Sequence, residues 1–149
     1  MALLQKHGVR YLLVGGGAVI YYGFPRLTGD MDFFYDASPD NARRLYAALD
    51  DFWSGQIPNL NKQDELTEPG LILQFGVPPN RIDLINQIDG VTFAEVWPQR
   101  LMLAMPFGGK TVEVSMIGLA DLIRNKEAAQ RPKDLDDLKF LRRALQTRK

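Results

Sequence analysis

Cysteine is absent from the chain, and histidine occurs only once, as His7. The lack of cysteine excludes disulfides, thiolate nucleophiles and cysteine-ligated zinc. A single histidine excludes multi-histidine metal sites, and a serine, histidine and aspartate triad would have to use His7, which lies in a segment that we expect to be helical and far from any motif. The chemistry open to this chain therefore rests mainly on carboxylates.

The sequence also lacks net charge and a long apolar run, and we do not expect its first residues to act as a signal peptide. Its 18 Lys and Arg residues balance 18 Asp and Glu residues, although basic residues gather in the last third and offer a local patch to a polyanion such as RNA. No stretch reaches the ~20 apolar residues of a membrane span. Residues 1–10 have none of the parts of a secretion signal. We therefore expect a cytoplasmic protein that does not enter a membrane.

The length and the apolar pattern predict one domain of the α/β or α+β class. A chain of 149 residues buries roughly two-thirds of its unfolded surface, enough for a core without disulfides. We predict a mixed, twisted β-sheet flanked by helices, with a core over residues 9–115 and C-terminal helices over residues 118–146. The expected strands span residues 10–14, 30–35, 71–75, 81–85, 101–105 and 110–114, and the expected helices span residues 18–22, 39–49, 119–129 and 134–145, with a helical turn over 93–97 and a long loop over 55–70.

Three carboxylates stand on predicted strands where apolar residues would be expected. Asp30 and Asp32 share one strand, and Asp83 lies within another. Residues i and i+2 of a strand project from the same face about 7 Å apart, so the first two carboxylates are parallel. Buried carboxylates need a cation partner, and an all-oxygen site suits Mg²⁺ or Mn²⁺. These residues are therefore candidate metal ligands.

A glycine turn follows the first predicted strand, at residues 15–17. Glycine permits close backbone approach, and the amides at the start of the following helix favour an anion such as a triphosphate. Metal-binding carboxylates near a phosphate-binding turn are the parts that metal-assisted phosphoryl or nucleotidyl transfer requires.

The order of these motifs resembles that of the DNA polymerase β-like nucleotidyltransferase superfamily. Gly15-Gly16 is followed after thirteen residues by Asp30-Met31-Asp32. The wider pattern is similar to small bacterial nucleotidyltransferases related to abortive-infection and toxin–antitoxin transferases. It comprises Tyr11 to Ala18, Gly23-Phe-Pro-Arg26, Thr28 to Asp32 and, near the C-terminus, Leu122-Ile123, Lys126, Ala129, Arg131 to Asp134 and Asp137-Leu138.

The resemblance implies a role for each matching residue. Asp30 and Asp32 would hold catalytic metal ions, Mg²⁺ or Mn²⁺. Asp83 would be the third metal-binding carboxylate and would activate the acceptor hydroxyl. The nucleotide-binding residues implied are Gly15, Gly16, Arg26, Thr28 and Lys126. Two features depart from the pattern: the extra Gly17 loosens the turn, and the segment before the first strand is short, which would expose an apolar edge for a second subunit or a partner.

Simpler structural explanations compete with these roles. Asp30 and Asp32 would brace a turn by pairing with Arg26, and Asp83 would pair with Arg81. The charged residues from 131 to 137 would form a solvated helix start, because acidic groups in a first turn suit the helix dipole. Lys126 would be a surface charge, and the aromatic residues Trp53, Trp97 and those at 33–35 would be core.

Taken together, these patterns predict a metal-dependent nucleotidyltransferase. It would transfer a nucleoside monophosphate from a nucleoside triphosphate to a hydroxyl acceptor, which the resemblance leaves open among RNA or tRNA, protein and small molecules. A homodimer, an antitoxin or another partner protein are further expected partners. The alternative is a catalytically inactive module with the nucleotidyltransferase fold that binds a partner protein. Retention of all three strand carboxylates favours the enzyme, because a scaffold has no use for them.

Overall fold

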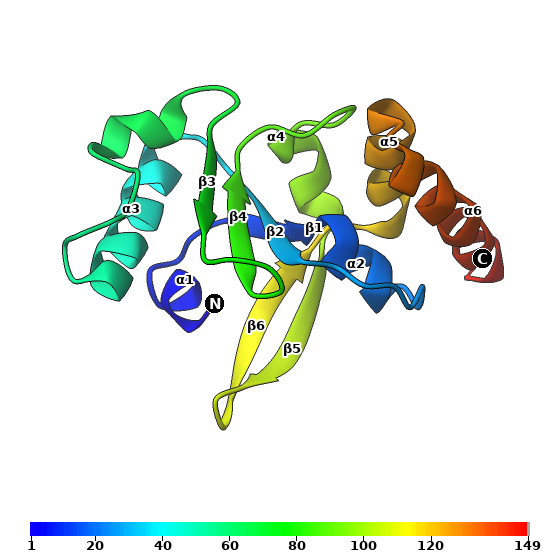
Figure 1. Ribbon diagram of the computed structural model, residues 1–149, viewed down its shortest axis with the longest axis horizontal. Helices are drawn as coiled ribbons and strands as arrows, with labels where there is room; N and C mark the ends of the chain where they lie inside the picture. Colours follow the sequence, from blue (N-terminus) through cyan, green and yellow to red (C-terminus); the bar gives the residue numbers. More distant parts are fainter. Residues whose placement is uncertain (149) are drawn as a thin grey trace.

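The computed structural model describes residues 1–148 and contains one six-stranded mixed sheet with helices around it (Figure 1). The strands lie in the order β3-β4-β2-β1-β6-β5. The strand bounds are β1 Tyr11–Val14, β2 Asp30–Tyr35, β3 Ile72–Phe75, β4 Arg81–Ile85, β5 Leu101–Phe107 and β6 Lys110–Met116. The predicted fold class, with its mixed sheet and helical C-terminal third, is confirmed.

The helices include two short 3₁₀ segments. Their bounds are α1 Ala2–Lys6, α2 Gly15–Tyr21, α3 Pro39–Trp53, η1 Gln63–Thr67, α4 Phe93–Val96, η2 Trp97–Gln99, α5 Leu119–Ala129 and α6 Pro132–Thr147. The prediction that helix begins only at residue 18 was wrong: the glycines are the first turn of α2, which follows β1 without a loop. No helix within residues 1–148 is both long and apolar enough to span a membrane.

The central strands combine parallel and antiparallel pairing. β1 pairs antiparallel with β2 and parallel with β6, and β2 pairs parallel with β4. The hairpins β3-β4 and β5-β6 complete the two edges, and the second projects beyond the body of the molecule (Figure 1). Because β2 and β4 are parallel neighbours, residues near their starts lie side by side, and this brings residues 30–32 next to residues 81–83.

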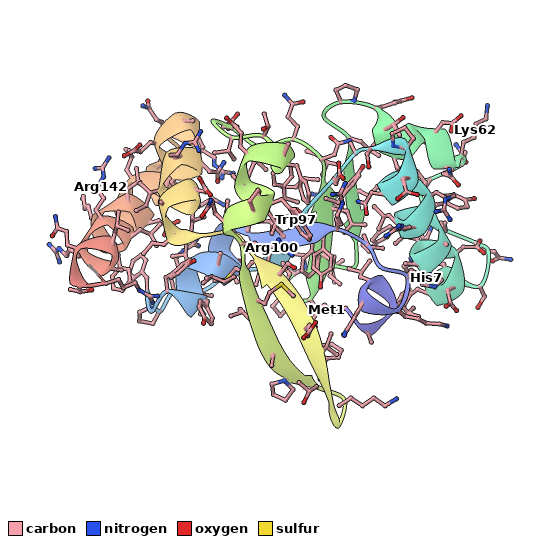
Figure 2. All side chains as sticks on the ribbon, turned by 180° about the vertical axis from the view of Figure 1, so that it is seen from behind. Met1, His7, Lys62, Trp97, Arg100 and Arg142 are labelled. Atoms are coloured by element: carbon pink, nitrogen blue, oxygen red, sulfur yellow. The ribbon has the colours of Figure 1, made fainter. Side chains whose placement is uncertain are left out.

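Alternation along β2 sends successive side chains to opposite layers. Phe33 and Tyr35 face the layer of α3 and η1, where the Tyr35 hydroxyl donates to the carbonyl of Leu66 at 2.9 Å. Phe34 faces the other layer and packs on Phe93, whose ring stacks on Trp97. Arg100 lies over the Trp97 ring at 3.8 Å (Figure 2). These aromatic residues are core and packing elements, as expected.

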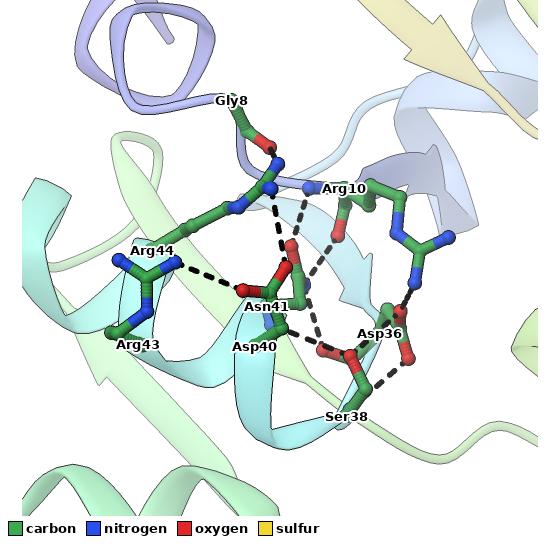
Figure 3. A network of polar contacts seen from close by, with 8 residues as sticks. All are labelled: Gly8, Arg10, Asp36, Ser38, Asp40, Asn41, Arg43 and Arg44. Atoms are coloured by element: carbon green, nitrogen blue, oxygen red, sulfur yellow. Dashed lines mark hydrogen bonds and ion pairs between the residues drawn. The ribbon is translucent and has the colours of Figure 1, made fainter.

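A polar network joins the start of α3 to the chain before β1 (Figure 3). Ser38 caps the helix by accepting from the backbone N–H of Asn41 at 3.3 Å. The buried Asn41 side chain accepts from the N–H of Arg10 and donates to the carbonyls of Arg10 and Asp36. Arg10 also pairs with Asp36. The network holds α3 against one end of the sheet, on the side away from α5 and α6.

An apolar cleft of about 300 Å³ lies between α1, α3 and the sheet face that carries Phe33. Phe52 and Phe107, 66% and 53% exposed, are among its lining residues. These exposed rings lie beside α1, whose first residues also line the cleft.

Candidate active site

The three predicted carboxylates meet on one face of the sheet. The pairing of β2 with β4 sets Asp32 directly opposite Asp83 and Asp30 opposite Arg81. Each aspartate offers an oxygen that lies within 4.8 Å of the others. Asp83 is buried at 7% exposure, and Asp30 and Asp32 are half-buried. Like charges directly opposite each other across two strands are destabilising, so this arrangement calls for a cation.

Arg81 provides one such cation. Its Nε donates to Asp83 Oδ1 at 2.8 Å, and its Nη2 donates to Asp83 Oδ2 at 3.2 Å and to Asp30 Oδ2 at 2.7 Å. Thr28 Oγ1 donates to the other oxygen of Asp30 at 3.2 Å. The ion pair between Arg81 and Asp83 that the sequence offered as a simpler explanation is therefore present, whereas Asp30 pairs with Arg81 and not with Arg26.

Asp32 is the carboxylate that Arg81 does not reach. It has no hydrogen bond or ion pair through its side chain within residues 1–148. Burial, followed by the charges of Asp30 and Asp83, raises the pKa of Asp32 to about 6, while Lys133 and Arg131 act in the opposite direction. A carboxylate held in this way gains most from a bound cation.

The glycine turn lies directly against the carboxylates. Gly15 has a φ of +63°, and a Cβ atom there would lie 2.2 Å from Asp32 Oδ2. A Cβ atom on Gly16 would lie 2.7 Å from Thr28 Oγ1 and 3.2 Å from Arg26 Nη2. The two glycines therefore allow the backbone at the start of α2 to approach Asp32 and Thr28 more closely than any other residue would.

Arg26 and Lys126 lie in a second charged cluster, between the glycine turn and the C-terminal helices. Arg26 Nη2 donates to Asp137 Oδ2 at 3.1 Å. Lys126 is 1% exposed, and its Nζ lies 2.6 Å from Asp134 Oδ1 and 3.0 Å from Asp137 Oδ2. In this structure Lys126 is therefore neither a surface charge nor open to a ligand, and its nucleotide-binding role stays a prediction.

The prediction of a solvated helix start was wrong for two of its residues. Asp134 and Asp137 are fully buried, at 0% exposure. Burial would raise the pKa of Asp134, but hydrogen bonds from Arg131 and Lys126 outweigh it and hold that pKa below its ordinary value. Asp134 also accepts from the backbone N–H of Arg131 at 3.1 Å, so it caps α6 from within the cluster.

A family model described as "Nucleotidyltransferase of unknown function (DUF6036)" matches residues 1–142. The match spans the sheet, the carboxylates and α6 as far as residue 142. The chain belongs to this family. Among curated proteins, none matched the chain. Membership of DUF6036 supports the general reaction class, transfer of a nucleotidyl group, and therefore a nucleotide substrate.

The carboxylates of this DUF6036 protein fit a divalent metal ion. Their donor set is all oxygen, which suits Mg²⁺ or Mn²⁺. The Asp32 carboxylate is desolvated and has no hydrogen-bond or ion-pair partner within residues 1–148, and its Oδ2 lies directly against the backbone of Gly15. Asp30, Asp32 and Asp83 are the residues that would hold the ion.

Sequence reasoning assigned no site role to three basic residues of this DUF6036 chain. Arg81 contacts two of the carboxylates, and Arg131 and Lys133, from the start of α6, lie near enough to lower the pKa of Asp32. The contact of Arg81 with Asp83 could be predicted from the sequence, because the two residues are two positions apart on one strand and share a face. The other two depend on how α6 packs against the sheet.

Proposed function

We propose that the chain is a metal-dependent nucleotidyltransferase of the polymerase β-like superfamily. It transfers a nucleoside monophosphate from a nucleoside triphosphate to a hydroxyl acceptor and releases pyrophosphate. The observation that carries this proposal is the meeting of Asp30, Asp32 and Asp83, with oxygens within 4.8 Å of one another, against the glycine turn at Gly15. Membership of a nucleotidyltransferase family supports the same reaction.

Each part of the site takes one task in this proposal. A divalent metal ion, when bound by Asp30, Asp32 and Asp83, supplies a Lewis acid for phosphate oxygens. Asp83 accepts the proton of the acceptor hydroxyl, whose oxygen bonds to the α-phosphorus while the bond from that phosphorus to the β-phosphate oxygen breaks. The backbone at Gly15 and Gly16 is assigned to the triphosphate, because glycine permits close approach of a ligand to the main chain.

Two positively charged residues near Asp32 are assigned to binding the nucleotide phosphates. Lys133 is exposed and has no ion-pair partner within residues 1–148, and Arg131 is 58% exposed at its side chain. Both lie within electrostatic reach of Asp32. We assign them to the outer phosphates of the nucleotide, because cations placed there neutralise charge on the departing pyrophosphate. Arg26 and Thr28 hold the glycine turn in place, through Asp137 and Asp30 respectively.

The finer relationship is proposed on the sequence motifs. We place the chain beside the small bacterial transferases related to abortive-infection and toxin–antitoxin systems, as one cytoplasmic domain over residues 1–149. That placement implies an antitoxin or other partner protein, and a homodimer. The acceptor in this proposal is RNA, protein or a small molecule.

Calorimetric titration with each of the four nucleoside triphosphates, with and without Mg²⁺, tests the proposal. Wild type should bind at least one of them in a metal-dependent way, and the Asp30→Ala/Asp32→Ala variant should not. The Asp40→Ala/Asp136→Ala variant removes the same charge from exposed positions and should bind as wild type does. A labelled triphosphate then identifies the acceptor by transfer to RNA, protein or small molecules.

The proposal fails if wild type binds no triphosphate with Mg²⁺ or Mn²⁺, or if the double variant binds as tightly as wild type. Either result would favour the inactive module that binds a partner protein.

A further inference from the structure

Arg81 occupies the position in the acidic cluster that a cation would take. It extends from the first residue of β4, and its guanidinium faces Asp30 across the ladder and Asp83 along its own strand. Three of its hydrogen bonds, of 2.7, 2.8 and 3.2 Å, end on these two carboxylates. The Arg81 side chain is 29% exposed, so the ion pairs are partly shielded from water.

The two cross-strand pairs of the cluster differ in charge: one joins opposite charges and the other joins like charges. Asp30 opposite Arg81 is a favourable pair, whereas Asp32 opposite Asp83 is a like-charge pair. Three carboxylates and one guanidinium leave a formal charge of −2, which one divalent ion balances. The same guanidinium repels that ion and holds oxygens that would otherwise coordinate it.

We propose that Arg81 is a positioning residue that competes with the divalent metal ion for Asp30 and Asp83. In the metal-free protein Arg81 holds these carboxylates together and stabilises the site. When the ion binds, the contacts between Arg81 and these carboxylates are exchanged for contacts to the ion. Asp32 can bind the ion without giving up a contact, because Arg81 does not reach it. This inference rests on the proposed metal site at Asp30, Asp32 and Asp83.

Competition and simple support predict opposite effects on metal affinity. If Arg81 competes with the metal, Arg81→Gln removes a repelling charge and frees carboxylate oxygens, so Mn²⁺ should bind at least about fivefold more tightly. If Arg81 serves only to orient Asp83 for the metal, the same variant should bind Mn²⁺ more weakly. Arg81→Lys keeps the charge without the fork, so its Mn²⁺ affinity should stay within about twofold of wild type.

The measurement is Mn²⁺ affinity from the electron paramagnetic resonance signal of free Mn²⁺, with thermal unfolding in EDTA as a second readout. Arg81→Gln should lower the melting temperature of the metal-free protein and increase the upward shift that Mn²⁺ produces. The matched control is Arg142→Gln, which breaks an ion pair of the same 2.7 Å length with Glu127 on the α5-α6 surface (Figure 2). The control should leave Mn²⁺ affinity unchanged.

Wild-type protein provides a test that does not depend on the folding of a variant. During a Mg²⁺ titration of ¹⁵N-labelled protein, the Arg81 Nε–H resonance should shift more than that of Arg142, because its bond to Asp83 is exchanged. An unchanged Arg81 resonance in Mg²⁺-saturated protein, or Mn²⁺ affinity in Arg81→Gln equal to or weaker than wild type, overturns the inference.

Asp32→Asn separates this inference from the proposed function. If Asp32→Asn binds Mn²⁺ as wild type does, the proposed metal site itself is wrong. If Asp32→Asn loses Mn²⁺ while Arg81→Gln gains no affinity, the metal site stands and only the competition by Arg81 is wrong.

Discussion

At the scale of single residues, Asp32 combines burial with two neighbouring negative charges. The structure raises its pKa to about 6 from an ordinary value of 3.8. The folded protein therefore binds a proton at Asp32 more readily than the unfolded chain does. Below about pH 4, Asp32 is protonated in both states and does not lower the free energy of unfolding. As the pH rises from about 4 toward 6, ionisation of Asp32 increasingly lowers the free energy of unfolding, and the full loss remains at higher pH.

Asp32→Asn should therefore stabilise the metal-free protein at neutral and alkaline pH. At pH 8 in EDTA we expect a gain of about 1–2 kcal/mol in the free energy of unfolding, reduced from the full shift because Asp32 is only partly buried. The gain should disappear near pH 4, where wild-type Asp32 is protonated. Urea unfolding of both proteins across this range measures the difference, and a gain that is constant with pH contradicts the pKa assignment.

Gly15 lies directly against Asp32, so a larger residue at this position should disturb the carboxylate. Gly15→Ala should destabilise the protein by at least about 1–2 kcal/mol, because alanine disfavours a φ of +63° and its Cβ would displace the Asp32 carboxylate. We also expect the variant to lose metal-dependent nucleotide binding in calorimetry.

Gly108→Ala is the matched control for Gly15→Ala. Gly108 has a similar φ of +57°, but a Cβ atom there meets nothing within 4 Å. This variant should show the backbone cost alone and retain nucleotide binding. Equal loss of nucleotide binding in the two variants would show that nucleotide binding does not depend on the contact between Gly15 and Asp32.

At the scale of elements, α5 and α6 are joined to the glycine turn by buried charge. Lys126 on α5 bridges Asp134 and Asp137 on α6, and Asp137 receives Arg26 from the segment that follows α2. Two carboxylates at 0% exposure are tolerable only while their cations remain. The helices are therefore positioned by a cluster of paired buried charges as well as by apolar packing.

Lys126→Met should lower the free energy of unfolding by about 3–5 kcal/mol, because it removes the buried cation that Asp134 and Asp137 share and leaves each of these carboxylates with one arginine. Urea denaturation measures the loss. Lys139→Met makes the same change on the exposed face of α6, where the side chain is 76% exposed, and should cost less than about 0.5 kcal/mol. A Lys126→Met protein of normal stability that fails to bind nucleotide would instead support the phosphate-binding role that the sequence resemblance implied.

At the scale of the whole molecule, the packing of α6 brings Arg131 and Lys133, at its start, toward the carboxylate cluster on β2 and β4. Lys133 and Arg131 act on Asp32 although they follow it by about two-thirds of the chain. The start of α6 thus places positive charge near a candidate site whose carboxylates come from β2 and β4.

Lys133→Gln should weaken metal-dependent triphosphate binding by about three- to tenfold, because it removes one charged contact to the outer phosphates. The melting temperature should be unchanged, since Lys133 is exposed and has no ion pair within residues 1–148. Lys139→Gln, on the same helix, is the control. Calorimetry with triphosphate and monophosphate measures the effect, and an equal loss for both nucleotides would contradict the assignment to the outer phosphates.

The sequence by itself determined the six strands and the identity of the candidate carboxylates, whereas it placed the start of α2 three residues late and left η1 within an expected loop. Local periodicity is sufficient to locate strands, and all six expected strands are present. Alternation along a strand also placed Asp30 and Asp32 on one face, because this geometry depends only on the backbone of that strand. The same rule places Arg81 beside Asp83, so that contact was within reach of sequence reasoning.

Only the tertiary structure decided which cations meet the carboxylates other than Asp83. Asp134 and Asp137 are typical of a solvated helix start in sequence, yet they are buried because Lys126 and Arg26 approach from other elements. The parallel pairing of β2 with β4 likewise set Asp32 opposite Asp83 and left it without a partner. Local patterns contain no information on these contacts, because burial and charge pairing arise between segments that are distant in the chain.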